Sequence, residues 1–214
     1  MSKVTLIHYD IGNLLSVERA LHHLGADFTI AKTPEQIENA DKLILPGVGA
    51  FSSCVNEVKN RGFEAPIKQA VDSGKYLLGI CVGMQMLFET SEEFGTHQGL
   101  GFIEGHVKAI PAENTSGQPH KIPHIAWTSL QPPAQNPAAW DDPLLSGITP
   151  NAEVYFVHSF TAHPDHAQNR VADSYYGGNP IASIVKQDNV YGTQFHPEKS
   201  GAIGLKILEN FLKL

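Results

Sequence analysis

The chain has 214 residues, of which 42% are hydrophobic and 17% are charged, and its formal net charge is −7. This length suits one α/β domain with a substantial core. Because the charge is negative and lysine and arginine form no block, nucleic acid and anionic membranes are not expected as partners. No stretch is apolar for long enough to cross a membrane, and two cysteines cannot build a disulfide framework, so we expect a cytoplasmic protein.

The first half of the chain alternates short β-like runs with helix-like runs, which is typical of a parallel sheet covered by helices. Strands are predicted at residues 4–8, 28–31, 42–45 and 75–80, with helices at 14–24, before residue 73 and at 82–90. Beyond residue 102 the pattern predicts strands at 153–160, 170–176, 181–186 and 190–195, joined by long loops, and a closing helix at 202–212. We therefore expect a single domain over residues 1–214, with a mostly parallel central sheet flanked by helices and additional antiparallel strands in the C-terminal half.

Functional groups of an open parallel sheet gather beyond the carboxyl ends of its strands. The residues that follow predicted strand ends are Asp10, Gly12 and Asn13, then Pro46, Gly47 and Gly49, and finally Cys81.

Cys81 stands at a predicted strand-to-helix turn, where a thiol can become a nucleophile. Gly79 and Gly83 flank it and permit a sharp, crowded bend. The free N–H groups and the dipole of the following helix favour the thiolate. This context alone is a partial match to the Gly-x-Ser-x-Gly elbow, and a lone cysteine is more commonly a small buried hydrophobe. Cys54 lies in a helical run and is interpreted as an inert packing residue.

A base for such a nucleophile is present at the end of the strand predicted over residues 190–195. His196 has the imidazole usual for this role, and Glu198 can curl back to orient the ring because Pro197 fixes the backbone between them. A histidine taken singly is more commonly a surface or core residue, but the combination with an elbow cysteine favours catalysis. No histidine or cysteine set has the spacing of a metal site, so neither a metal nor a cofactor is expected.

Donors for a developing oxyanion are predicted next to Cys81. The N–H of Val82 follows the nucleophile directly. Gly47, Val48 and Gly49 form a second candidate, because two glycines let the backbone approach a ligand closely. On its own this segment is also consistent with a plain glycine-rich turn.

Three separated segments together resemble the class I (triad) glutamine amidotransferases. They are Pro46-Gly47-Val48-Gly49-Ala50-Phe51, Gly79-Ile80-Cys81-Val82-Gly83-Met84-Gln85 and Gln194-Phe195-His196-Pro197-Glu198-Lys199-Ser200. The first segment, with Tyr155 to Phe160 and the residues after the first strand, most resembles the glutaminase subunits of imidazole glycerol phosphate synthase. The resemblance implies that Cys81 attacks the amide carbon of glutamine, that His196 is the base and that Glu198 orients it. It also implies that glutamine is bound by Gln85, Glu93, Ser159 and Phe160.

The same resemblance implies a partner, a (β/α)8 cyclase subunit that forms a heterodimer with the chain and receives the ammonia. The chain itself has no phosphate-binding loop for a nucleotide substrate. The residues implied at the interface are Asp10, Gly12, Asn13, His124, Trp127 and Lys199.

The chain departs from that family on the implied docking face. It has Ala126-Trp127-Thr128 where Gly-Trp-Asn is usual, and Asp10 where a small residue is usual. A glutaminase paralogue that feeds a sugar amidotransferase therefore stays an alternative. A stand-alone γ-glutamyl cysteine hydrolase and a non-catalytic module are further alternatives, and the triad residues argue against the last. The loop at residues 131–143 is long and has no assigned role.

Overall fold

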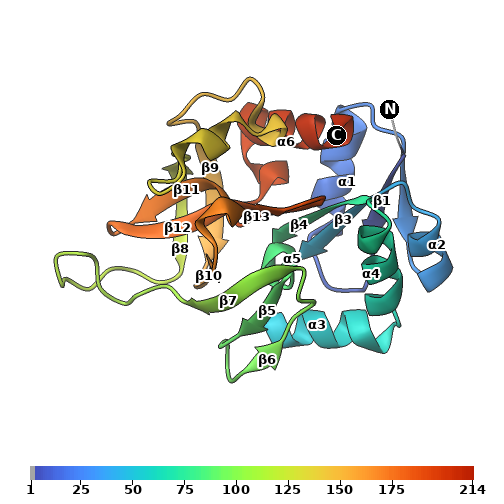
Figure 1. The fold of residues 1–214 in the computed structure, drawn as a ribbon, viewed down its shortest axis with the longest axis horizontal. Helices are drawn as coiled ribbons and strands as arrows, with labels where there is room; N and C mark the ends of the chain where they lie inside the picture. The colour runs from blue at the N-terminus through green and yellow to red at the C-terminus, as the bar shows by residue number, and fades with distance from the viewer. Residues whose placement is uncertain (1–2) are drawn as a thin grey trace.

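A seven-stranded sheet forms the centre of the computed structural model, which describes residues 3–214 (Figure 1). The strand order is β11-β12-β13-β4-β3-β1-β2. The parallel part contains β13 (Val190–Thr193), β4 (Tyr76–Cys81), β3 (Lys42–Gly47), β1 (Val4–Ile7) and β2 (Phe28–Ala31). The antiparallel edge contains β11 (Arg170–Tyr176) and β12 (Asn179–Gln187). The predicted mixed sheet is confirmed.

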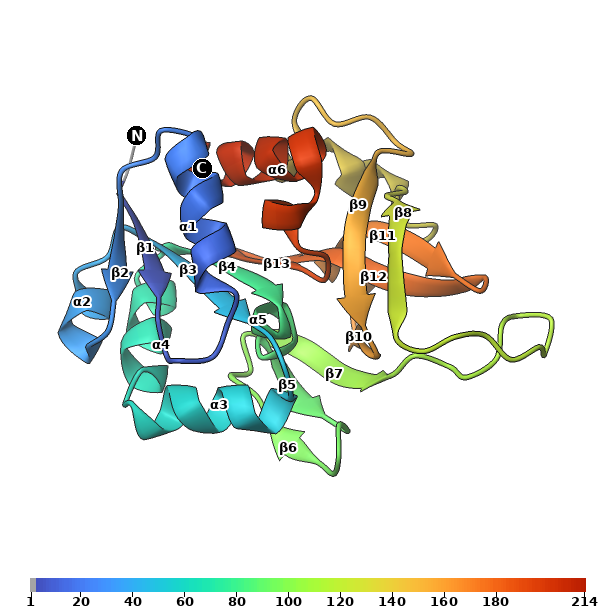
Figure 2. The same ribbon diagram turned by 180° about the vertical axis from the view of Figure 1, so that it is seen from behind.

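Helices cover both faces of this sheet (Figures 1 and 2). One face carries α1 (Leu14–His23) and α6 (Gly201–Lys213), and the other carries α2 (Pro34–Glu38), α3 (Phe51–Asn60) and α4 (Glu64–Asp72). A capping box between Thr33 and Gln36 starts α2. Burial on both faces explains why β1 and β3 are almost continuously apolar in sequence, since both are buried along their whole length. None of the helices within residues 3–214 is long and apolar enough to span a bilayer.

Residues 88–164 add two smaller sheets. The first has the order β10-β7-β5-β6, from β10 (Phe160–Pro164), β7 (Ile103–Ala109), β5 (Phe88–Ser91) and β6 (His97–Gln98). The second pairs β8 (His124–Ser129) with β9 (Glu153–His158). The loop between β7 and β8 projects from the body of the molecule in both views (Figures 1 and 2).

Two predicted elements differ in the structure. The helix expected at residues 82–90 is only α5 (Val82–Gln85), because the chain then turns into β5, whose residues pair with β7. The strand expected at residues 153–160 is divided into β9 and β10, which join different sheets. Short apolar runs of this kind carry no periodicity long enough to separate helix from strand. The loop at residues 131–143 contains the 3-10 helix η1 (Pro137–Asp141) and is followed by η2 (Pro143–Leu145).

Lys42 is a charged residue inside the core, only 2% exposed. Its Nζ donates hydrogen bonds to the carbonyl oxygens of Phe211 at 2.9 Å and Leu212 at 3.0 Å. Carbonyls in the last turn of a helix have no partner within the helix. Lys42 therefore caps the C-terminal end of α6 from within the core.

Lys42→Met should lower the free energy of unfolding by about 2 kcal/mol, because it removes a charged donor to the Leu212 carbonyl and leaves the Phe211 carbonyl with only the N–H of Leu214. Lys213→Met is the matched control, since Lys213 lies on α6 but bonds only the exposed Glu209. It should change stability by less than about 0.5 kcal/mol. Urea unfolding of both variants measures the difference, and equal losses would contradict a capping role for Lys42.

Candidate active site

Cys81 lies at the junction of β4 and α5, and its backbone has φ 56° and ψ −112°. A positive φ at a residue other than glycine is strained and persists only where the surroundings enforce it. Here the surroundings are backbone. A Cβ added at Gly83 would lie 1.9 Å from the carbonyl oxygen of Leu45, and one at Gly47 would lie 2.5 Å from the nitrogen of Gly83. The sharp turn predicted from Gly79 and Gly83 is confirmed, and the thiol it presents is 4% exposed.

The helix that follows Cys81 is shorter than the sequence predicted. α5 has four residues, so its dipole is weak and contributes less to a thiolate than expected. The amide of Val82 still follows Cys81 directly, and Val82 lines the same cavity as Cys81.

His196 ends the segment after β13 and is N-terminal to the 3-10 helix η4 (Pro197–Lys199). This single turn brings Glu198 back to the ring, where Oε1 accepts a hydrogen bond from His196 Nδ1 at 2.8 Å. The Glu198 side chain is fully buried, and Oε1 also accepts from Asn13 Nδ2 at 3.1 Å. With Nδ1 held in this way, Nε2 is the ring nitrogen free to exchange a proton with Cys81.

The charge state of His196 depends on these neighbours. Burial opposes a charged imidazolium, but hydrogen bonds and negative charge at Cys81 and Glu198 outweigh it and raise the pKa of His196 to about 10. A raised pKa means that the charged ring stabilises the fold fully below pH 6.5 or so and that this contribution is lost as the pH rises through about 10.

Glu198→Gln should lower the pKa of His196, because an amide offers a hydrogen-bond acceptor but no negative charge. The decrease should exceed about one unit, which corresponds to roughly 1.4 kcal/mol of lost interaction with the imidazolium. The 15N chemical shifts of the His196 ring, followed from pH 5 to 11, measure both midpoints. A parent midpoint near 6.5 would show that the ring is not paired as described.

A cavity of about 300 Å³ opens beside Cys81. Its lining includes most residues predicted from the sequence: Val48, Gly49, Cys81, Val82, Gln85, Glu93, Ser159, Phe160 and His196. Gly47 does not line the cavity but packs against Gly83. Glu93 is 9% exposed, and its Oε2 accepts a hydrogen bond from the backbone nitrogen of Phe51 at 2.6 Å. The carboxylate of Glu93 and the thiol of Cys81 therefore line the same cavity.

Two buried side chains hold the segment Gly47 to Gly49 from behind. Tyr9 donates from its hydroxyl to the carbonyl of Pro46 at 2.6 Å. Cys54 donates from its thiol to the carbonyl of Val48 at 3.3 Å, and burial raises the pKa of Cys54 to about 11, so this group stays protonated. The peptides on either side of Gly47–Val48 are therefore anchored.

The residues predicted at a docking face separate into two groups. Asp10, Gly12, Asn13, Trp127 and Lys199 reach the surface at least in part, and Trp127 is 51% exposed. His124 is completely buried, because alternate residues of β8 point inward, so its assignment to a contact surface is corrected.

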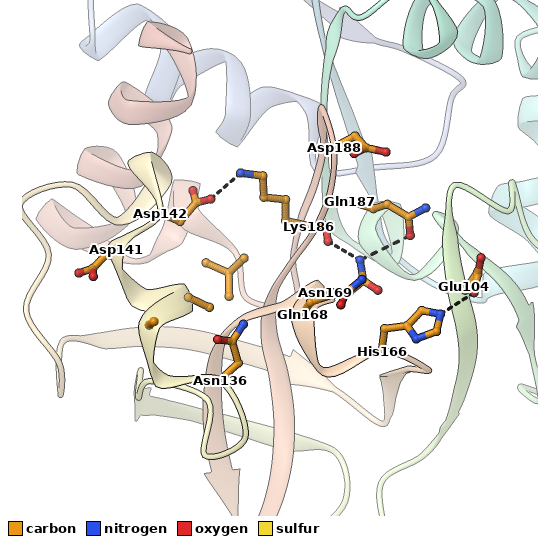
Figure 3. Close-up of a pocket in the computed structure, with 13 residues that line it drawn as sticks. Glu104, Asn136, Asp141, Asp142, His166, Gln168, Asn169, Lys186, Gln187 and Asp188 are labelled. Atoms are coloured by element: carbon orange, nitrogen blue, oxygen red, sulfur yellow. Dashed lines mark hydrogen bonds and ion pairs between the residues drawn. The ribbon is translucent and has the colours of Figure 1, made fainter.

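A larger cavity, of about 660 Å³, lies away from Cys81 between η1, η3 (Ala167–Asn169) and the end of β12 (Figure 3). Two pairs of its titratable groups contact one another: Lys186 Nζ lies 2.8 Å from Asp142 Oδ2, and His166 Nε2 lies 2.7 Å from Glu104 Oε2 (Figure 3). Among residues 3–214, no cysteine or serine lines this larger cavity. The smaller cavity at Cys81 is therefore the candidate active site.

Gln194 and His158 contact this site but were not among the predicted site residues, and Asn13 was predicted only at the partner interface. Gln194 lies 4.0 Å from Cys81 Sγ through its Nε2, and its Oε1 accepts from Gln85 Nε2 at 3.1 Å. His158 lines the cavity, and Asn13 binds the triad carboxylate as well as reaching the surface. Gln194 and His158 stand inside motifs that resemble the family, which is the signal that could have identified them.

Comparison with known proteins assigns the family. The model of the family "Glutamine amidotransferase class-I" matches residues 6–214. The chain is 47% identical to "Imidazole glycerol phosphate synthase subunit HisH 1" of Legionella pneumophila (strain Lens), with 100% of both chains covered. It is 43% identical to the HisH subunit of Salinibacter ruber, over 98% of this chain and 94% of the relative.

The fold is also shared with solved structures. A crystal structure of a glutamine amidotransferase superposes with a TM-score of 0.71 at 20% identity, covering 98% of this chain and 97% of that one. The PurLQS structure from Thermotoga maritima superposes with a TM-score of 0.70 at 19% identity, covering 100% of this chain and 99% of that one. The predicted fold class is confirmed. The chain belongs to the class-I glutamine amidotransferase family and, within it, to the HisH subunits of imidazole glycerol phosphate synthase.

Proposed function

We propose that the chain is the glutaminase subunit of an imidazole glycerol phosphate synthase in histidine biosynthesis, acting in the cytoplasm as a single glutamine amidotransferase domain without a cofactor. One observation carries the chemistry: Cys81 at a strained elbow shares a cavity with His196, whose ring is held by the buried side chain of Glu198. The relatives' shared name supports the pathway.

Catalysis begins when Cys81 Sγ attacks the side-chain amide carbon of L-glutamine. His196 Nε2 already holds the proton of the Cys81 thiol, because the pKa of the ring is raised to about 10, and it delivers this proton to the departing nitrogen, so ammonia leaves and a γ-glutamyl thioester remains. A water molecule then gives its proton to the same nitrogen and attacks the thioester carbonyl, which releases glutamate and restores the thiol. Glu198 fixes the ring tautomer throughout.

The oxyanion of each tetrahedral intermediate needs backbone donors. Val82 supplies one N–H directly after the nucleophile. The segment Gly47, Val48 and Gly49 supplies the second, and the anchors on Pro46 and Val48 leave the intervening peptide as the one that can rotate. Removal of one such donor costs about 3–4 kcal/mol in the transition state, so rotation of this peptide is sufficient to switch the enzyme.

Glutamine fits the polar groups of the cavity. Glu93 binds the α-ammonium group through its carboxylate. Gln85, Ser159 and Phe160 surround the rest of the amino acid. A carboxylate at this place favours an amino-acid substrate over a neutral amide.

The ammonia passes to a (β/α)8 cyclase subunit that docks as a heterodimer partner beside the triad. Leu15, Ile125 and Trp127 are more than half exposed, at 57%, 56% and 51%. Trp127 lies close to the segment that carries Glu198. Its indole is 3.9 Å from the position of a Cβ added at Gly201, and Gly201 follows η4 and Ser200 in the sequence. Exposed aromatic and aliphatic side chains of this kind are typical anchors of protein interfaces.

The test measures glutamate release by the chain alone, with the cyclase, and with the cyclase plus its nucleotide ligand. We expect slow hydrolysis by the isolated chain and a large increase in the full mixture. Fast hydrolysis of γ-glutamyl peptides without any partner would support a stand-alone hydrolase instead. Stimulation by a sugar amidotransferase subunit, and not by the cyclase, would support the alternative that the chain is a glutaminase paralogue feeding a sugar amidotransferase.

A further inference from the structure

Two buried histidines form a hydrogen-bonded chain behind the cavity. Thr128 Oγ1 lies 2.8 Å from His124 Nε2, and His124 Nδ1 lies 3.0 Å from His158 Nε2. His158 Nδ1 in turn lies 2.8 Å from the carbonyl oxygen of Phe160. This hydrogen-bonded chain of side chains extends from β8, near the exposed Ile125 and Trp127, to the start of β10 at the cavity.

The partners determine where each proton lies. The carbonyl of Phe160 can only accept, so His158 Nδ1 carries a proton and donates it. In a neutral ring His158 Nε2 is then an acceptor, which requires His124 Nδ1 to donate and leaves His124 Nε2 to accept from the Thr128 hydroxyl. Every ring nitrogen of the pair has a partner, and both rings are neutral.

The surroundings of His158 and His124 also favour neutral rings. Burial and the neighbouring histidines lower the pKa of His158 to about 3, although its bond to Phe160 opposes the shift. Burial, with His120 nearby, lowers the pKa of His124 to about 4. The pair therefore places no positive charge next to His196.

At the cavity end, the hydrogen-bonded chain reaches Gln85, a residue proposed to bind glutamine. The carbonyl of Phe160 also accepts a hydrogen bond from Gln85 Nε2 at 3.0 Å, and the same nitrogen bonds Gln194 Oε1 at 3.1 Å. With both amide hydrogens directed at these acceptors, Gln85 Oε1 is the atom left to accept from a substrate. The position of one carbonyl thus decides how Gln85 faces the cavity.

We propose that His158 is a positioning residue for the substrate amino acid: its Nδ1–H fixes the Phe160 carbonyl, which orients Gln85, and His124 holds His158 in the required tautomer. This inference rests on the proposed glutaminase function. Because the effect is on substrate placement, loss of the bond should raise KM for glutamine more than it lowers kcat.

Two substitutions at one position separate this role from a general packing role. In His158→Asn the amide nitrogen occupies the place of Nδ1 and keeps a donor for Phe160, but the acceptor for His124 is lost. In His158→Gln the terminal oxygen occupies the place of Nε2 and keeps that acceptor, but the donor for Phe160 is lost. Each variant therefore removes one of the two hydrogen bonds that His158 makes, to His124 or to Phe160.

We expect His158→Gln, assayed with the cyclase present, to raise KM for glutamine at least tenfold with kcat within about threefold of the parent. His158→Asn should raise KM by less than about threefold. Equal effects of the two variants, or an effect on kcat alone, would overturn the inference. A parent that hydrolyses no glutamine with its cyclase would instead refute the proposed function, and this inference with it.

An independent readout needs neither glutamine nor the cyclase. In 15N-histidine NMR spectra of the free chain at pH 6, both rings should be neutral, with the proton of His158 on Nδ1. A charged ring, or a proton on Nε2 of His158, would overturn the inference while leaving glutamine hydrolysis unaffected.

Discussion

Cys81→Ala is expected to abolish glutamine hydrolysis, with a loss of at least about 10⁴-fold in the complex with the cyclase. The reason is chemical, because no other thiol or hydroxyl lining the cavity occupies the elbow between the Val82 amide and the ring of His196. Binding of glutamine should persist, since the carboxylate of Glu93 is untouched. Glutamate release measures the first effect, and isothermal titration with glutamine measures the second.

Cys54→Ala is the matched control, because it removes the other cysteine of the chain. Cys54 is buried and donates only a weak thiol hydrogen bond to Val48, so the variant should keep hydrolysis within about tenfold of the parent. A glutamine-like diazoketone should label the parent and Cys54→Ala at Cys81, and should not label Cys81→Ala. Comparable losses from both substitutions, or a hydrolysis rate above 1% in Cys81→Ala, would rule out Cys81 as nucleophile.

Gly83→Ala is expected to destabilise the whole domain by more than about 3 kcal/mol. The added Cβ would lie 1.9 Å from the carbonyl oxygen of Leu45, a backbone atom that cannot move without displacing β3. Because β3 also carries the oxyanion segment, hydrolysis should be lost together with stability. Urea unfolding with tryptophan fluorescence as the probe measures the change.

Gly74→Ala serves as the comparison for Gly83→Ala. Gly74 has φ +86°, but a Cβ there would meet nothing within 4 Å. The cost should be about 1–2 kcal/mol from backbone strain alone, with activity retained. If Gly83→Ala is no more destabilising than Gly74→Ala, the elbow is not packed as tightly as described.

The arrangement of the proposed catalytic residues could be predicted because they lie in local patterns. Cys81 follows a buried strand and is flanked by glycines, and His196 and Glu198 are two residues apart on one turn, so short-range geometry decides how they lie. The parallel sheet could also be predicted, since its strands are mostly apolar runs separated by amphipathic helices.

Other features depend on contacts between distant parts of the chain. Asn13 meets Glu198 across 185 positions, and Gln194 meets Gln85 across 109, so no local pattern reveals either bond. β5 forms because β7 offers it a partner, which overrides the helical spacing of residues 82–90. The family resemblance implied that His124 lies at the partner interface with Trp127, but the alternation of β8 directs His124 inward.

The measurement that tests the central claim most directly follows the amide nitrogen itself. The chain, its cyclase and the nucleotide acceptor are incubated with glutamine labelled with 15N at the side-chain amide, in buffer containing unlabelled ammonium. We predict that the label enters the imidazole glycerol phosphate product without dilution, and that Cys81→Ala abolishes this transfer while unlabelled ammonium still supports synthesis. Label found only in free ammonium, or transfer that survives Cys81→Ala, would contradict a glutaminase that passes ammonia from Cys81 to its partner.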